Sequence, residues 1–150
     1  MPMCLKKKVF EQCLIPTLTY GCETWPLKIN TLHKIRTTQR AMERKILGIS
    51  LLDKINHTAI REKTKFKDVV SYTLNMKWKW AGHVGRMKDN RWTIKCTRWA
   101  PQGKRKRGRP RRRWADDLSK YKSNWLDLTA HREEWKELAE GYIQQWIDVA

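Results

Sequence analysis

Apolar side chains recur at helical spacing over several parts of the chain. The clearest run has them at three- and four-residue steps, at Leu32, Ile35, Met42, Ile46 and Ile49, with Gln39 at the intervening position. Gly48 stands where a C-terminal cap is expected, so the pattern predicts an amphipathic helix over 32–47. Arg36, Arg40 and Arg44 lie off the apolar stripe and give this helix a basic face.

Weaker periodicity predicts helices on both sides of this one. A first short helix would place Val9, Cys13 and Leu14 on one side and end at Pro16, because proline cannot continue the hydrogen-bond ladder. A second is expected over 57–63, with Asn56 or Asp53 as its cap. A longer one is expected over 68–87. Its shared face would comprise Val69, Tyr72 or Thr73, Met76, Trp80 and Val84.

The end of the chain carries two aromatic stripes. The first has Trp114, Leu118, Tyr121 and Trp125, and the second has Trp135, Leu138, Tyr142 and Trp146. Two such helices can pair across these faces as a hairpin, with Thr129 as candidate N-cap of the second and Glu133 and Glu134 in its first turns.

Between these helical parts, residues 88–113 lack periodicity. Pro101, Gly103, Gly108 and Pro110 interrupt any regular element, so we expect an extended basic linker there. The predicted fold is therefore all-α, with three parts: a small thumb-like helical bundle over 1–87, the linker over 88–113, and an acidic, Trp-rich helical hairpin over 114–150.

Charge follows the same division. The 33 Lys and Arg against 15 Asp and Glu give the chain a formal charge of +18. Residues 76–113 hold 15 basic side chains and a single acidic one, whereas residues 114–150 hold 4 basic and 8 acidic ones. Such a concentration of positive charge favours a polyanionic partner, DNA or RNA.

The densest basic run, 104–113, has eight cations in ten residues. They are Lys104, Arg105, Lys106, Arg107, Arg109, Arg111, Arg112 and Arg113. Arg107-Gly108-Arg109-Pro110 resembles an AT-hook, whose extended arginine-rich backbone fits the minor groove of A·T-rich DNA. A nuclear-localisation signal or a non-specific phosphate grip are the competing interpretations.

Other candidates lie just before this run. His83, with Arg86 nearby, either contacts a base or phosphate or is a packed histidine at a helix end. Four tryptophans alternate with five cations, an arrangement typical of a stacking platform beside a phosphate track or of core packing with Lys and Arg stems. They are Trp78, Trp80, Trp92 and Trp99 with Lys77, Lys79, Arg91, Lys95 and Arg98. Trp80 falls on the apolar stripe, which favours a core position.

Asp116 and Asp117 raise the question of a polymerase metal site. Such a site needs several carboxylates from apolar strands, and here three arginines precede the pair and a helical pattern follows. We expect both acids in the first turn of a helix starting near Trp114, stabilising its dipole and pairing with the arginines. The sequence predicts no catalytic residue, no metal site and no cofactor.

The spacing of the cysteines and the hydropathy indicate the cellular compartment. The four cysteines, at positions 4, 13, 22 and 96, form no C-x-x-C pair, so reduced thiols are expected. No apolar run is long enough to cross a bilayer, and the N-terminus lacks the apolar region of a signal peptide. We expect a nuclear or cytoplasmic protein without a membrane partner.

Five blocks in order carry a family resemblance: LIPTLTYGCETW, QRAMERKILGISLLDKINHTAIREKTK, KWKWAGHVGRMKDNRW, GKRKRGRPRRRWADDL and AHREEWKELAEGYIQQW. Together they resemble the C-terminal end, thumb and post-thumb, of endonuclease–reverse transcriptases of non-LTR retrotransposons. The resemblance implies an RNA-directed DNA polymerase whose palm carboxylates precede this region, so we expect the chain to be inactive alone. It also implies the parent's palm as a partner.

Two function classes follow. The first is a non-catalytic nucleic-acid-binding fragment that contacts template–primer or target DNA through the basic helix and the RGRP-centred run. The alternative is a protein-interaction remnant whose acidic, Trp-rich tail docks on a basic surface. DNA-versus-RNA preference, A·T preference and oligomeric state stay open.

Overall fold

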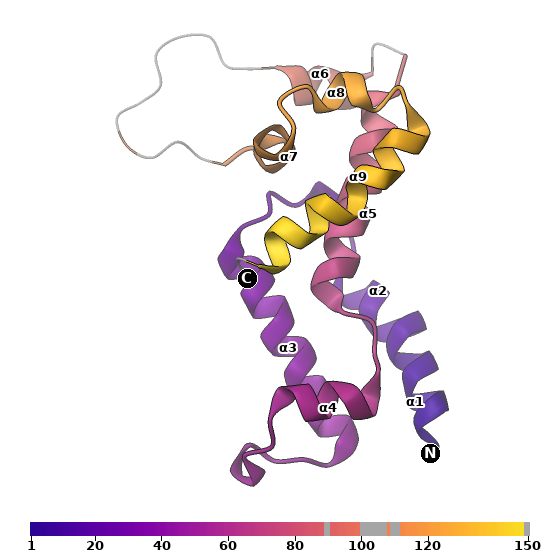
Figure 1. Ribbon diagram of the computed structural model, residues 1–150, viewed down its shortest axis with the longest axis vertical. Helices are drawn as coiled ribbons and strands as arrows, with labels where there is room; N and C mark the ends of the chain where they lie inside the picture. Colours follow the sequence, from indigo (N-terminus) through magenta and orange to yellow (C-terminus); the bar gives the residue numbers. More distant parts are fainter. Residues whose placement is uncertain (89–90, 100–107, 109–111, 149–150) are drawn as a thin grey trace.

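The computed structural model describes residues 1–88, 91–99, 108 and 112–148, and within these every regular element is a helix, which confirms the all-α prediction (Figure 1). In chain order the elements are α1 (Met3–Val9), η1 (Phe10–Leu14), α2 (Ile15–Leu18), η2 (Cys22–Thr24), α3 (Ile29–Leu47), η3 (Leu51–Asp53), α4 (His57–Thr64), α5 (Val69–Gly85), α6 (Trp92–Arg98), α7 (Asp116–Tyr121), α8 (Trp125–Leu128) and α9 (Arg132–Ile147).

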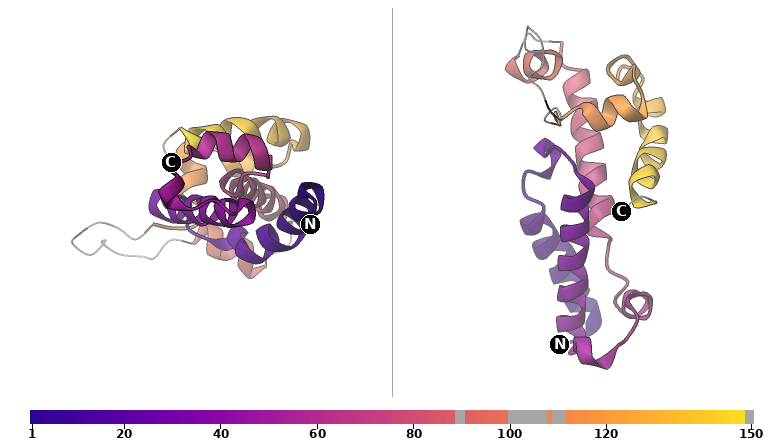
Figure 2. Two further views of the ribbon diagram at one scale, coloured as in Figure 1. Left: turned by 90° about the horizontal axis from the view of Figure 1, so that it is seen from below. Right: turned by 90° about the vertical axis from the view of Figure 1, so that its left-hand side faces the viewer.

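Helix α5 is the central element of an elongated molecule. The η2 turn and helices α3, α6, α8 and α9 all pack against it. Helices α6, α7 and α8 gather at one end of the molecule, while α1 and α4 lie toward the other, and α9 runs back along α5 (Figures 1 and 2). The fold therefore joins the beginning and the end of the chain through one helix.

The helical start of the chain does not end at Pro16 as predicted. Pro16 lies in the first turn of α2, directly after the π-helical turn η1. In that turn the Ile15 N–H donates to the Phe10 carbonyl, five residues back. Because proline is tolerated in a first helical turn, the wider π turn lets the chain stay helical to Leu18. Its buried residues are Phe10 and Ile15, whereas Val9, Cys13 and Leu14 are exposed.

Local stop and start signals are confirmed around α3 and α4. Gly48 ends α3 in the left-handed conformation at φ 71°, and its N–H donates to the Arg44 and Lys45 carbonyls. Asn56 caps α4 through its side-chain oxygen, which accepts a hydrogen bond from the Thr58 N–H at 3.2 Å. These are contacts within a few residues, so the sequence specifies them directly.

Gln39, at the gap in the apolar stripe of α3, is fully buried and joins three segments. Its Nε2 donates to Glu43 Oε1 at 2.8 Å and to the Lys67 carbonyl at 2.9 Å, while its Oε1 accepts from the Val69 N–H at 2.8 Å. Arg61 pairs with Glu43 at 3.1 Å. Burial raises the pKa of Glu43, an effect that Arg61 opposes. This amide therefore fixes the start of α5 against α3.

The buried surface of α5 is wider than the predicted face. Val69, Thr73 and Val84 of that face are buried, as predicted, whereas Met76 and Trp80 are only half-buried. Lys77 and Trp78 are buried as well, with Val70, Leu74 and Ala81. Helices pack on α5 from more than one side, so the apolar stripe alone did not identify the whole buried surface. The side that receives α9 is centred on Trp78.

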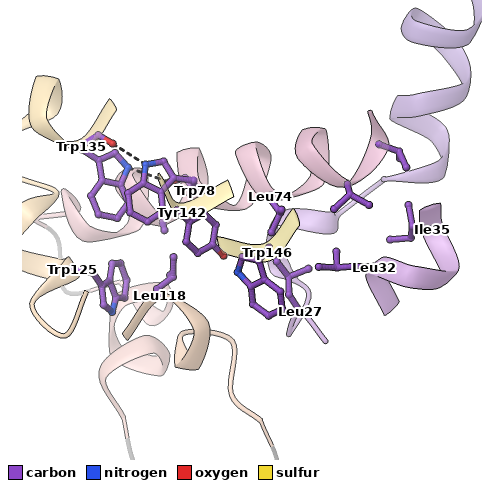
Figure 3. Close-up of a cluster of buried hydrophobic side chains, with 13 residues drawn as sticks. Leu27, Leu32, Ile35, Leu74, Trp78, Leu118, Trp125, Trp135, Tyr142 and Trp146 are labelled. Atoms are coloured by element: carbon purple, nitrogen blue, oxygen red, sulfur yellow. Dashed lines mark hydrogen bonds between the residues drawn. The ribbon is translucent and has the colours of Figure 1, made fainter. Parts of the chain in front are cut away.

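An aromatic stack fastens α9 to α5 (Figure 3). The rings of Trp78 and Trp135 are stacked at 3.8 Å with an angle of 4° between them. Each indole N–H donates to the other residue's carbonyl, at 2.8 and 3.2 Å. Tyr142 stacks on Trp78 from a second position, at 4.7 Å. Gly82 allows this approach, because a Cβ there would lie 2.5 Å from Trp135 Nε1.

The C-terminal part is not a separate hairpin. The first aromatic stripe is divided between α7 and α8, and Leu118, Trp125, Trp135, Tyr142 and Trp146 share one hydrophobic core with α3 and α5 (Figure 3). Both stripes bury against Trp78, and they also contact each other, with 5.8 Å between the ring centroids of Tyr121 and Tyr142 and 6.4 Å between those of Trp125 and Trp135. Thr129 does not cap α9; its hydroxyl donates to the Leu126 carbonyl. The domain boundaries themselves stay a prediction.

Candidate nucleic-acid interface

The predicted nucleic-acid-binding residues fall into two groups in the structure. Arg36, Arg40 and Arg44 lie on α3. His83, Arg86 and Arg91 lie at the end of α5 and just before α6, and Arg112 and Arg113 lie just before α7. Lys104, Arg105, Lys106, Arg107, Arg109 and Arg111 lie outside the described residues.

The three arginines of α3 follow one another at four-residue steps beside its buried face. Each is half-buried, and the neighbouring positions Leu32, Ile35, Gln39 and Glu43 face the core. Since residues four apart lie on one side of a helix, the three guanidinium groups form one basic row along α3. The predicted arrangement of the basic face is thus present.

His83 and Arg86, predicted together, have different surroundings. The His83 side chain is exposed, and its ring centroid lies 5.3 Å from that of Trp80. Arg86 Nη1 donates to the Thr129 carbonyl at 3.1 Å, and desolvation lowers the pKa of Arg86. His83 is therefore open to a ligand, while Arg86 holds the turn after α8.

The predicted linker contains a helix, α6, that the sequence did not indicate. Thr97 donates to the Thr93 carbonyl, and Ile94 is buried, so α6 is anchored by one apolar side chain. Trp92 and Trp99 at its two ends are 78% and 66% exposed. Lys95 Nζ lies 5.2 Å from the centroid of the Trp92 ring. Exposed indoles and cations thus share one short helix.

The end of the basic run is tied to the C-terminal helices. The Arg112 guanidinium lies 5.4 Å from the centroid of the Trp146 ring on α9. The Arg113 N–H donates to Asp116 Oδ2 at 2.7 Å. These contacts fix where the chain enters α7. Of the RGRP motif, the structure describes only Gly108, which is exposed at φ 116°, a conformation that favours glycine.

A cavity of about 610 Å³ opens between α5, α6 and the start of α7. Its lining includes Trp80 from α5, Cys96 from α6, Trp99 directly after α6, and Arg113 and Trp114 before α7. Trp114 is held in place, since its Nε1 donates to the Glu23 carbonyl at 2.6 Å. Three indole rings from distant parts of the sequence are therefore brought to one cavity.

Asp116 and Asp117 lie in the first turn of α7, as predicted, although the helix begins at Asp116 rather than Trp114. Their partners differ from the expected arginine side chains. Asp117 is 2% exposed and pairs with Lys77 at 2.8 Å, and it accepts a hydrogen bond from the Tyr142 hydroxyl at 2.5 Å. Lys77 also donates to the Trp25 and Trp114 carbonyls. The carboxylate thus fastens α7 to the core.

Burial shifts the pKa values of both partners of Asp117. Desolvation lowers the pKa of Lys77 and raises that of Tyr142 well above its ordinary value of 10.0, so the phenol stays a donor. Sequence reasoning counted Lys77 and Trp78 in a stacking platform, whereas the structure buries both and pairs Lys77 with Asp117. The position of Lys77 among Val70, Leu74, Trp78 and Ala81 is the signal, because a lysine inside an apolar stripe needs a buried anion.

Neither the cysteines nor the acids gather into a metal site in the part of the chain that the structure describes. Cys22 is buried, and Cys4, Cys13 and Cys96 are exposed and free. In the same residues, no helix is both long and apolar enough to span a membrane.

Comparison with known proteins gives one informative similarity. The chain is 32% identical, over 146 aligned residues, to a transposon-derived protein of Caenorhabditis elegans. The alignment covers 87% of this chain and 52% of that relative, so the chain spans about half the length of the curated protein that it matches. No family model matches the chain. No solved structure matches it either.

Proposed function

We propose that this chain is a transposon-derived, nucleic-acid-binding region that corresponds to the thumb and post-thumb end of a non-LTR retrotransposon reverse transcriptase. Two observations support the origin: the five ordered sequence blocks, and the similarity to a transposon-derived protein over most of the chain. The all-helical fold agrees with a thumb-like role.

The distribution of charge around α6 is the observation that carries the proposal. Residues 76–113 contain 15 cations and one acid, and exposed Trp92 and Trp99 lie among them. Cations neutralise phosphates and release counterions, while exposed indoles stack on bases. A protein–protein interface of ordinary composition is depleted in lysine, which makes nucleic acid the better match.

The arginine row of α3 supplies a second contact surface. Arg36, Arg40 and Arg44 are half-buried, so their stems pack on the helix while their guanidinium groups can reach a phosphate backbone. Because α3 and α6 lie toward different ends of the molecule, a duplex contacting both would run along its length (Figure 1). Template–primer or target DNA are the proposed ligands.

We assign nucleotide addition to another part of the parent protein. Asp117, the acid best placed by sequence to suggest a metal ligand, is occupied by Lys77 and Tyr142. A carboxylate enclosed in this way has no coordination site left for a catalytic cation. The chain would therefore hold nucleic acid and leave nucleotide addition to the palm of the polymerase.

A salt titration of binding to duplex DNA and to RNA tests the proposal. For about eight neutralised phosphates on duplex DNA, log affinity should fall against log salt with a slope near −7. Replacing the four cations at 104–107 with Gln should reduce the magnitude of that slope by about 3 to 4.

A matched control replaces four exposed lysines far from this run with Gln. These lysines are Lys8, Lys34, Lys63 and Lys65. The control variant should retain most of the slope. A slope near zero for the unaltered chain, or equal losses in the two variants, would argue against a localised phosphate contact.

The alternative, a protein-interaction remnant, has one observation in its favour. Glu133, Glu134, Glu137 and Glu140 are exposed on α9 and form an acidic outer face. Trp125, Trp135 and Trp146 are buried in the chain's own core and are not free to dock. Replacing the four glutamates with Gln separates the two functions, because tighter DNA binding would identify α9 as an internal competitor.

A further inference from the structure

We infer that the cavity between α5, α6 and the start of α7 receives unpaired bases of a single-stranded nucleic acid. This inference rests on the proposed function and specifies that the bound nucleic acid is single-stranded. The cavity measures about 610 Å³, within the range of roughly 300–1,000 Å³ typical of small-ligand sites. This volume is large enough for flat aromatic ligands such as unpaired bases.

The walls have the chemistry of a base-stacking site. Trp80, Trp99 and Trp114 line the cavity from three segments. Trp114 is fixed by its hydrogen bond to the Glu23 carbonyl and by edge contact with Trp125 at 6.2 Å. Trp99 is 66% exposed, so its ring is available to a ligand. A fixed ring and an open ring in the same cavity both offer faces on which an entering base gains stacking.

Arg113 supplies positive charge for the backbone of the strand, because it lines the cavity and is exposed. Asp116 is the single acid in the lining, and its Oδ2 accepts the Arg113 N–H. An exposed carboxylate beside stacked rings accepts hydrogen bonds from exocyclic amino groups, which unpaired bases present and most apolar peptides lack.

The positions of two lining residues in the sequence also favour a single-stranded nucleic acid as the occupant of the cavity. Trp99 precedes the run of eight cations over 104–113 in the sequence, and Arg113 is the last residue of that run; both line the cavity. A strand attracted by the charge of the run would therefore meet the aromatic cavity at Arg113. Phosphate attraction brings the strand close, and base stacking in the cavity selects unpaired over paired regions.

Cys96 provides a chemical reporter inside the cavity. Its thiol is free and exposed, and it lines the cavity, whereas Cys4 and Cys13 are exposed far from it on α1 and η1. The probe is a 12-nucleotide single strand with one base carrying a thiopyridyl disulfide. The Cys96 thiolate attacks that disulfide and forms a mixed disulfide with the base, and pyridinethione leaves with the electron pair.

Peptide mapping after limited reaction with the full chain should find the strand on Cys96 faster than on Cys4 or Cys13. Rates are normalised to those of a small thiopyridyl reagent without nucleic acid. The same base inside a hairpin duplex should react with Cys96 no faster than with the other two thiols. Equal rates at all three cysteines, or Cys96 protection by an indole-containing peptide but not by unmodified single strand, would overturn the inference.

Binding measurements on two matched variants complete the test. Trp99→Ala should weaken single-strand binding about five- to a hundred-fold, the loss of one stacked base, and leave duplex binding unchanged. Tyr20→Ala is the control, because Tyr20 is an exposed aromatic residue outside the basic part of the chain and does not line the cavity. Both residues are exposed, so circular dichroism should report the same helix content in each.

The outcomes separate the cavity from the general function. If Trp99→Ala binds single strands as the unaltered chain and Tyr20→Ala do, while the steep salt slope persists, the cavity assignment is wrong and nucleic-acid binding stands. If the unaltered chain binds neither single strand nor duplex, both the cavity assignment and the proposed function are wrong.

Discussion

The buried ion pair of Lys77 and Asp117 offers the sharpest test of how the two ends of the chain are joined. Lys77 is fully buried and Asp117 is 2% exposed, with 2.8 Å between Nζ and Oδ1. Lys77 also donates to the Trp25 and Trp114 carbonyls at 3.1 and 2.7 Å. Tyr142 donates to the second carboxylate oxygen. Every strong partner that this pair needs is present, so removing one group leaves the others unmatched.

The expected cost follows from which charge is left behind. Asp117→Asn leaves a buried ammonium with neutral acceptors and no counter-charge, and Lys77→Met leaves a buried carboxylate with only the Tyr142 hydroxyl. Each single change should destabilise the fold by about 3–5 kcal/mol, as is usual when one partner of a buried pair is removed. The double change removes both charges, so its cost should fall about 2–3 kcal/mol below the sum of the single costs.

Urea unfolding at pH 7, followed by tryptophan fluorescence and by far-ultraviolet circular dichroism, measures these free energies. The exposed pair Glu133 and Lys136, also 2.8 Å apart, is the matched control, and Glu133→Gln should leave the midpoint unchanged. Single costs below about 1 kcal/mol, or a double cost equal to the sum, would refute the view that a desolvated pair fastens α7 to α5.

Three further changes test other contacts. Gly82→Ala should raise the free energy of the fold by about 1–3 kcal/mol, seen as a lower thermal midpoint, because its Cβ meets the locked Trp135 ring. An unchanged midpoint would mean that the ring can move. Gln39→Met should cost about 2–4 kcal/mol in urea unfolding, since the Val69 N–H loses its acceptor; a cost under 1 kcal/mol would contradict this. For Glu43, burial raises the folded-state pKa above its ordinary 4.5. The unfolded chain thus releases this proton first, and the stability of the chain relative to Glu43→Gln should fall as the pH rises above 4.5. A pH-independent difference would show that Arg61 cancels the desolvation.

The candidate interface was only partly accessible from the sequence. The basic row of Arg36, Arg40 and Arg44 follows from four-residue spacing alone. The aromatic cavity does not, because Trp80, Trp99 and Trp114 become neighbours only when α6 and α7 fold against the end of α5. Trp80 was assigned to the core on periodicity, and its half-buried position at the cavity wall depends on which neighbours cover α5.

Local rules of the chain decided where several helices begin and end. Gly48 ends α3, Asn56 caps α4, and Asp68 caps α5 through the Ser71 N–H, each by contacts within four residues. Such hydrogen bonds are encoded in neighbouring residues, so the all-helical class and most boundaries follow from the sequence. Where a local rule failed, at Pro16, a π turn offered the backbone another way to remain helical.

Tertiary structure decided which faces meet. From the sequence, the aromatic stripes of the C-terminal part were predicted to pack against each other. In the structure they also bury against Trp78 on α5. The amphipathic pattern states that a face is apolar but not what covers it, since any large apolar surface lowers the free energy by a similar amount per unit area. The ion pair of Lys77 and Asp117, which are 40 residues apart, selects which helix faces pack together. A charge is tolerated in the core only where an opposite charge is buried beside it.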